Sequence, residues 1–173
     1  SLADGVSELR SIVRDEISRG AKWIKFAGSG GFGSPSDDPN QVTYSQEEMN
    51  VIVSTAKDLG IPTTLHVYGD EGIRRALKAG VTSIEHANLA SKKTLDLISK
   101  NNVYVVPTQI TVLKQARMAN NDNFWEEAGR PDFVRRKYQK YSQQLLESAN
   151  NLANSDVKIV FGSDIGTFSF EKN

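Results

Sequence analysis

The sequence predicts an α/β fold in which a parallel β-sheet is built from repeated strand–helix units. Short apolar runs of strand length alternate along the 173 residues with longer segments whose apolar residues recur at helical spacing. No Asn-Gly or Asp-Gly turn joins two alternating runs in the manner of a β-hairpin. Strands joined through helices are parallel and have right-handed crossovers, so we expect repeated βαβ units.

The individual elements follow in order from these patterns. A helix is expected over residues 5–19, and a second one follows the capping pair Ser45 and Glu48 and ends at Gly60. Further helices are expected at 70–80 and 91–101 and, after a polar segment at 109–130, at 133–152. Five strands are expected, at KWIKF (22–26), IPTTLHV (61–67), VTSIEH (81–86), VYVVPT (103–108) and VKIVFGSD (157–164).

Two architectures fit this order of elements. One is a doubly wound open sheet, and the other is an arc of a (β/α)8 barrel. A complete barrel needs eight strands and about 250 residues. Five strands in 173 residues therefore make the barrel interpretation a fragment, roughly the second half.

Composition excludes several classes of function. Lysine plus arginine and aspartate plus glutamate both number 21, so no net positive charge attracts nucleic acid or an anionic membrane. No apolar run approaches the roughly 20 residues that cross a bilayer. Cysteine is absent, which rules out disulfides and thiolate metal sites. We expect neither a nucleic-acid nor a membrane partner. The compartment stays open, with the cytoplasm favoured.

The glycines at 28, 30 and 33 match the G-x-G-x-x-G pattern of dinucleotide-binding loops. In such loops the last glycine opens a helix whose N-terminus holds the pyrophosphate. Here two prolines and two aspartates follow within residues 34–40, which disfavours a helix and a phosphate alike. We interpret the segment as a flexible loop at an active site.

Polar side chains end the predicted strands. Lys25 lies in the first strand, His66 and Tyr68 end the second, His86 ends the third and Asp164 ends the fifth. Taken singly, each has an ordinary structural explanation, such as a solvated lysine or an aspartate that caps a turn. The carboxyl ends of parallel strands share one rim, however, and the chain's two histidines both lie there. This convergence favours a metal site.

The chemistry of these residues suits a divalent cation. Neutral imidazoles and carboxylates bind Zn²⁺ and similar ions and leave positions open for water. A lysine with a lowered pKa can react with CO2 to form a carbamate that bridges two cations. Two metals about 3.5–4 Å apart would then hold a hydroxide and polarise a carbonyl, with Asp164 placed as general base.

The sequence resembles the amidohydrolase superfamily, in particular its prolidase-like branch of Xaa-Pro dipeptidases and arginine/lysine carboxypeptidases, relatives of imidazolonepropionase. The motifs that carry the resemblance are GAKWIKFAGSGGFGSP, IPTTLHVYGDEGIRRALKAGVTSIEHA, VYVVPT and IVFGSDIG. The resemblance implies that residues 1–173 form one partial domain, strands four to eight of a metal-dependent (β/α)8 barrel. It also implies that residues 109–131 are a variable segment covering the active site, although ordinary helix packing of this segment is an equally open interpretation.

The same resemblance assigns roles to the residues at the strand ends. It implies that Lys25 is the carboxylated lysine that bridges two metals, and that His66 and His86 are metal ligands. Asp164 would be the metal-bound general base, and Tyr68 would bind the substrate's α-carboxylate or simply line the pocket. The family's H-x-H ligand pair on the first strand has no counterpart here.

The expected function is metal-dependent hydrolysis of an amide or peptide C–N bond by a metal-bound hydroxide. The expected cofactors are two zinc ions, with Mn, Co or Fe also compatible, and a CO2-derived carbamate on Lys25. The expected substrate is a dipeptide, an N-acyl amino acid or a cyclic amide. With half of the site missing, we expect this chain to be inactive alone and to associate with another copy or with the missing barrel half. Two alternatives stay open: a Schiff-base lyase that uses Lys25, and a non-enzymatic binding domain.

Overall fold

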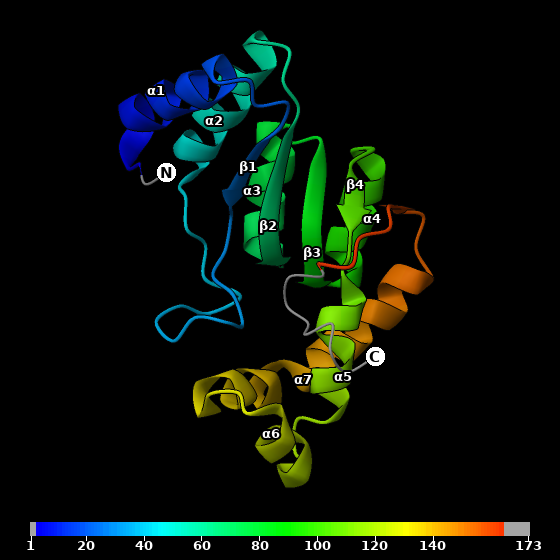
Figure 1. The fold of residues 1–173 in the computed structure, drawn as a ribbon. Coiled ribbons are helices and arrows are strands. Elements are labelled where there is room, and N and C mark those ends of the chain that lie inside the picture. Colours follow the sequence, from blue (N-terminus) through cyan, green and yellow to red (C-terminus); the bar gives the residue numbers. More distant parts are fainter. Residues whose placement is uncertain (1–2, 165–173) are drawn as a thin grey trace.

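A computed structural model describes residues 3–164 of the chain, which form a five-stranded sheet with helices packed against it (Figure 1). All four strand pairs are parallel, and the strands lie in the sheet in their order along the chain. The strands are β1 (Ile24–Ala27), β2 (Thr63–Gly69), β3 (Ser83–Leu89), β4 (Tyr104–Val106) and β5 (Lys158–Ile159).

This strand order decides between the two architectures. A doubly wound sheet reverses its strand order at a switch point, whereas a barrel adds each strand beside the previous one. The observed order β1-β2-β3-β4-β5 has no reversal. Right-handed crossovers then put successive helices on the same side of the sheet. The described sheet is therefore an arc of a (β/α)8 barrel, and the doubly wound alternative was wrong.

The helices of the repeat pack side by side along the outer face of this arc. They are α1 (Gly5–Ser18), α2 (Gln46–Asp58), α3 (Asp70–Ala79), α4 (Lys92–Lys100) and α7 (Asp132–Ala153). Each of them contacts the next in the series. The expected capping box begins α2: Ser45 accepts a hydrogen bond from the Glu48 N–H, and the Glu48 carboxylate accepts one from the Ser45 N–H. This exchange satisfies two backbone donors at the start of the helix.

The main core lies between the sheet and these helices. Its central side chains are fully buried and come from strands and helices in turn: Leu65, Val67, Ile73, Ile84, Leu95, Ile98 and Val105. A second cluster joins α1 and α2 to β1, and a third gathers around α7 at the carboxyl end of the sheet. The third cluster contains Phe32 and Tyr68, so it connects the outer helices to the rim where the polar residues were expected.

Much of the polar segment at 109–130, where the periodicity located no individual helix, is helical. It contains a 3-10 turn, η1 (Gln109–Thr111), and two short helices, α5 (Leu113–Arg117) and α6 (Asp122–Ala128). Asn121 caps α6 by accepting a hydrogen bond from the Phe124 N–H, and the buried Trp125 donates its indole N–H to the Met118 carbonyl at 2.9 Å. Short capped helices carry weak periodicity, which hid them in the sequence.

The strand boundaries also differ from the expected ranges, and β3 and β5 show this clearly. β3 continues three residues beyond His86 to Leu89, and β5 is limited to Lys158–Ile159 although eight residues were expected. Ile159 pairs in register with the buried Val105 but is 52% exposed, since no helix within residues 3–164 covers it. Residues 165–166 of the last quoted motif lie outside the described part.

The concave face of the sheet is open. Trp23, Tyr104 and Val160 are each at least 43% exposed there and line a hollow of about 620 Å³ with Thr64 and Glu85. In a closed barrel, side chains from all strands fill this interior. Within residues 3–164, no helix has the length and apolar character needed to cross a membrane.

Candidate active site

Two histidines and a tyrosine meet at the carboxyl ends of β2 and β3. The rings of His66 and His86 lie edge to face with their centroids 4.6 Å apart. Tyr68 stacks on His86 with a centroid separation of 4.8 Å and meets His66 edge-on at 5.0 Å. The three side chains therefore lie together at one rim, as the sequence predicted.

His86 reaches this rim through an unusual backbone conformation. In the parallel register His66 lies beside Glu85, and His86 lies beside Val67, which points into the core under the helices. Regular alternation would therefore turn His86 away from His66. Left-handed φ angles of 76° at His86 and 54° at Ala87 break the alternation. They bring the imidazole to the rim, at a cost of about 1–3 kcal/mol for each strained residue.

Each imidazole has one ring nitrogen engaged by a protein oxygen. Nε2 of His66 lies 3.3 Å from the Gly30 carbonyl oxygen, which can only accept, so Nε2 carries the proton and Nδ1 is left for another partner. Nδ1 of His86 lies 2.7 Å from the hydroxyl of Thr108, which leaves Nε2.

Burial keeps both imidazoles neutral. Burial, the adjacent His66 ring and the ammonium of Lys25 together lower the pKa of His86 to about 3. Burial also lowers the pKa of His66; Lys25 adds to this effect, and the Gly30 hydrogen bond and the Asp164 carboxylate oppose it. Neutral imidazoles are the form that binds a metal ion.

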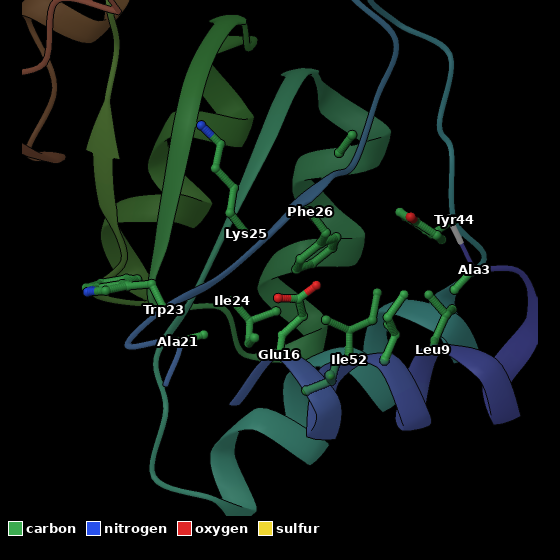
Figure 2. Close-up of a pocket in the computed structure, with 13 residues that line it drawn as sticks. Ala3, Leu9, Glu16, Ala21, Trp23, Ile24, Lys25, Phe26, Tyr44 and Ile52 are labelled. Atoms are coloured by element: carbon green, nitrogen blue, oxygen red, sulfur yellow. The ribbon is translucent and has the colours of Figure 1, made fainter. Parts of the chain in front are cut away.

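Lys25 lies on the inner face of β1, as the alternation of the strand predicts. Figure 2 shows Lys25 pointing away from the side on which Ile24 and Phe26 pack toward α1 and α2. Its side chain is exposed, because the concave face is open. Its charge acts on both histidines, which places it beside the same rim.

Asp164 lies at the last described position and is exposed, with a left-handed φ of 52°. Burial lowers the pKa of His66 and raises the pKa of Tyr68; the negative charge of Asp164 opposes the first effect and adds to the second, so Asp164 lies within electrostatic reach of the rim. Within residues 3–164, however, no three histidine, aspartate or glutamate side chains come together closely enough to form a metal-binding group.

Tyr68 is almost fully buried beside the two histidines. It is 6% exposed and lies between His86 and Phe32, whose ring is 5.1 Å away. Burial and the nearby Tyr138 ring raise its pKa, so the phenol stays protonated and can donate a hydrogen bond.

The glycine loop between β1 and α2 forms the wall of the site, and no helix follows its glycines, as predicted. A pocket of about 470 Å³ is lined by Lys25, Ser29, Gly31, Asp37 and His66. The loop is held from behind by Lys137 of α7, whose ammonium donates to the carbonyls of Gly31 and Ser34, both at 2.6 Å, and to Asp37 at 3.0 Å.

A second hollow, of about 450 Å³, lies between α1, β1 and α2 (Figure 2). Its walls are mainly apolar and include Leu9, Ile24, Phe26 and Ile52. Glu16 is the acidic residue in its lining. The hollow lacks the convergent polar groups that the rim has, so the rim is the better candidate for chemistry.

The residues at the rim fit a divalent cation in their donor chemistry. Two neutral imidazoles, each with one nitrogen left for a partner, lie in ring contact beside a lysine. Such nitrogen donors suit zinc and related ions. They make up part of a coordination sphere, and further ligands are needed to complete it.

Comparison with known proteins agrees with this geometry. The model of the amidohydrolase family matches residues 1–171. The chain belongs to the amidohydrolase family. Among solved amidohydrolases, a Xaa-Pro dipeptidase with methionine bound in its active site superimposes with a TM-score of 0.79 at 35% identity. The match covers 95% of this chain and 39% of the dipeptidase.

Ochratoxinase from Aspergillus niger is a second relative. Its sequence is 34% identical over 163 residues, which is 94% of this chain and 32% of ochratoxinase. Its crystal structure superimposes with a TM-score of 0.79. Phenylurea hydrolase B, at 21% identity and a TM-score of 0.66, shares the fold. The chain thus spans a third to two fifths of the length of these relatives, and it is part of a barrel.

The structure adds residues to the site that the sequence did not single out. Thr108 contacts His86, the Gly30 carbonyl contacts His66, and Lys137 fixes the loop that carries Gly30. Thr108 is the last residue of the predicted strand VYVVPT, and its place at a strand end could have indicated that it lies near the site. Lys137 lies 100 to 106 residues along the chain from the loop residues that it contacts, and no local pattern indicates those contacts.

Proposed function

We propose that this chain carries part of the active site of a metal-dependent amidohydrolase that cleaves the C–N bond of a small, carboxylate-bearing amide. The proposed substrate classes are dipeptides, N-acyl amino acids and cyclic amides. The observation that carries the proposal is the meeting of His66, His86 and Tyr68 at the ends of adjacent parallel strands, beside Lys25. The similarity to a Xaa-Pro dipeptidase and to ochratoxinase supports it.

In this proposal each residue has a distinct role. His66 and His86 would hold divalent cations, with zinc the first choice, and Lys25, carboxylated by CO2, would bridge two of them. Bound cations would supply a Lewis acid that polarises the amide carbonyl. Asp164 would bind a cation and act as general base, accepting a proton from the attacking water and passing it to the leaving nitrogen. Tyr68 would offer its hydroxyl to the substrate's α-carboxylate.

We further propose that the 173-residue chain hydrolyses little or nothing by itself. The sequence lacks an H-x-H pair, and the rim opens onto an exposed concave face. Catalysis at such a site requires a closed, dry cavity and a complete ligand set. An amidase rate near that of a complete relative, measured on this polypeptide alone, would contradict this proposal.

The test is zinc binding by the chain, compared with that of His66→Ala. We expect zinc to bind weakly to the original chain and at least tenfold more weakly to His66→Ala, as measured by titration and by elemental analysis of protein purified without chelator. Glu85→Gln is the matched control, because Glu85 lies beside His66 in the register but accepts a hydrogen bond from Thr64. Equal zinc affinity in all three proteins would refute the metal site.

A further inference from the structure

Thr108 has a backbone conformation that its residue type disfavours. It follows β4 with φ 44° and ψ 36°, in the left-handed region, and is 3% exposed. For a β-branched residue this conformation is an outlier, whereas glycine adopts it without strain. Strain of this kind persists where surrounding contacts fix it, and it is concentrated at functional sites. Because the backbone conformation favours glycine, we look to the threonine side chain for a role at this position.

Contacts on two sides hold Thr108 in place. Its carbonyl oxygen accepts hydrogen bonds from the N–H of Thr111 at 3.0 Å and from the Thr111 hydroxyl at 2.8 Å. On the other side, Gly162 lies next to Val106, and a Cβ atom at position 162 would collide with the Val106 side chain and come to 4.0 Å from the Thr108 methyl group. The Thr111 hydrogen bonds anchor the Thr108 backbone, and the Thr108 hydroxyl faces His86.

The hydroxyl of Thr108 lies 2.7 Å from Nδ1 of His86. Both groups are buried, with 3% and 5% of their residues' surface exposed, so water does not compete for the contact. Within residues 3–164, the Thr108 hydroxyl is the one hydrogen-bond partner of the His86 ring. The ring's other face and edge are occupied by Tyr68 and His66, which make ring contacts alone.

We propose that Thr108 is a positioning residue for His86: its hydroxyl accepts a hydrogen bond from Nδ1–H and thereby leaves Nε2 as the nitrogen with a free lone pair. The functional value of this arrangement rests on the proposed function, in which His86 holds a cation through that lone pair. The hydrogen bond and the tautomer are properties of the chain itself. Partners that orient a metal-binding histidine in this way typically change metal affinity 10- to 100-fold when they are removed.

Three substitutions separate the hydroxyl from the backbone of Thr108. Thr108→Ser keeps the hydroxyl. Thr108→Val keeps the shape and removes the hydroxyl. Thr108→Gly removes the hydroxyl and also relieves the left-handed strain, so it folds even where the valine variant does not. Thr111→Val is the control, because it weakens the anchor of the turn and leaves the Thr108 hydroxyl in place.

The first readout is the long-range ¹H–¹⁵N NMR spectrum of the imidazoles in the metal-free 173-residue chain, which has two histidines. We expect the Nδ1–H tautomer for His86 in the original chain and in Thr108→Ser. In Thr108→Val and Thr108→Gly we expect a mixture of tautomers, while Thr108→Gly melts within a few degrees of the original chain. An Nε2–H tautomer in the original chain, or an unchanged spectrum in both hydroxyl-free variants, would overturn the proposal.

The second readout is zinc affinity, which we expect to fall about 10- to 100-fold in Thr108→Gly and to be unchanged in Thr108→Ser. It distinguishes the two proposals. If the tautomer changes as expected but zinc binds to none of the proteins, Thr108 positions His86 and the metal-dependent function is wrong. If zinc binds to the original chain and to Thr108→Gly with equal affinity, the positioning role is wrong and the metal site stands.

Discussion

At the scale of single residues, left-handed backbone recurs in or after three successive strands. His86 within β3, Thr108 after β4 and Asp164 after β5 all have positive φ angles, and none of them is glycine. Each such residue costs about 1–3 kcal/mol and persists when neighbouring contacts fix it. The strain redirects side chains that strict alternation would place elsewhere, as the register of His86 shows. Backbone strain at this rim therefore serves to gather polar groups.

Asp38 illustrates how a single carboxylate on the glycine loop contributes to stability. Burial would raise its pKa, but hydrogen bonds from Lys140, Tyr141 and the Asn40 N–H outweigh burial and lower the pKa below its ordinary value of 3.8. A carboxyl whose pKa is lower in the folded state stabilises the fold above its unfolded pKa. That contribution is lost as the pH falls through the lowered folded value.

We therefore expect Asp38→Asn to flatten the acid limb of the stability curve. The free energy of unfolding of the original chain should fall from about pH 3.8 downward, and the variant should lose less over that range. Urea unfolding at a series of pH values between 6 and 3 measures this difference. Asp58→Asn, at an exposed carboxylate at the end of α2, is the control and should keep the original slope.

At the scale of elements, the contact between the glycine loop and α7 organises the site. The Lys137 ammonium has three N–H donors, and three loop oxygens accept them. Phe32 of the same loop is 5% exposed and stacks on Tyr138 of α7 with centroids 4.5 Å apart. Because the loop carries the Gly30 carbonyl that engages His66, α7 acts on the histidine through the loop.

We expect Lys137→Met to lower the free energy of unfolding by about 1–3 kcal/mol, because it leaves a carboxylate and two carbonyls without their donor. Lys137 is 11% exposed in its side chain. Lys140→Met is the matched control on the same helix. Its side chain is 61% exposed, and its ion pair with Asp38 contributes at most about 1 kcal/mol. Equal losses in the two variants, measured by urea unfolding, would show that the contacts of Lys137 with the glycine loop contribute no more to stability than an exposed ion pair does.

The elements also show what could be predicted from the sequence. Periodicity and caps located the repeated helices and strands, including the Ser45–Glu48 capping box and the end of α3 at Gly80. The alternation of β1 predicted correctly that Lys25 faces inward. Local patterns missed the redirection of His86, because it depends on backbone angles fixed by packing. They also missed the hydrogen bonds of Lys137 with the glycine loop, because these bonds join segments that are distant in sequence.

At the scale of the whole molecule, the described sheet is an arc with an exposed inner surface. The sequence predicted this arc from the number of strands, and the strand order confirmed it. Trp23, Tyr104 and Val160 present apolar surface to the hollow on its concave side. The outer edges of β1 and β5 have no paired strand within residues 3–164. Open sheet edges and apolar patches of this kind favour association.

We expect the isolated 173-residue chain to associate with itself through this concave face. Sedimentation velocity over a range of concentrations should show a shift from monomer to larger species, and Trp23→Glu should move that shift to higher concentration. Leu59→Glu is the matched control: Leu59 is 49% exposed, close to the 50% of Trp23, but it lies at the end of α2 on the helical side. If Trp23→Glu and Leu59→Glu weaken association equally, the association depends on general surface hydrophobicity and not on the concave face. If the original chain stays monomeric at every concentration, the concave face is not an association surface and the arc is stable when open.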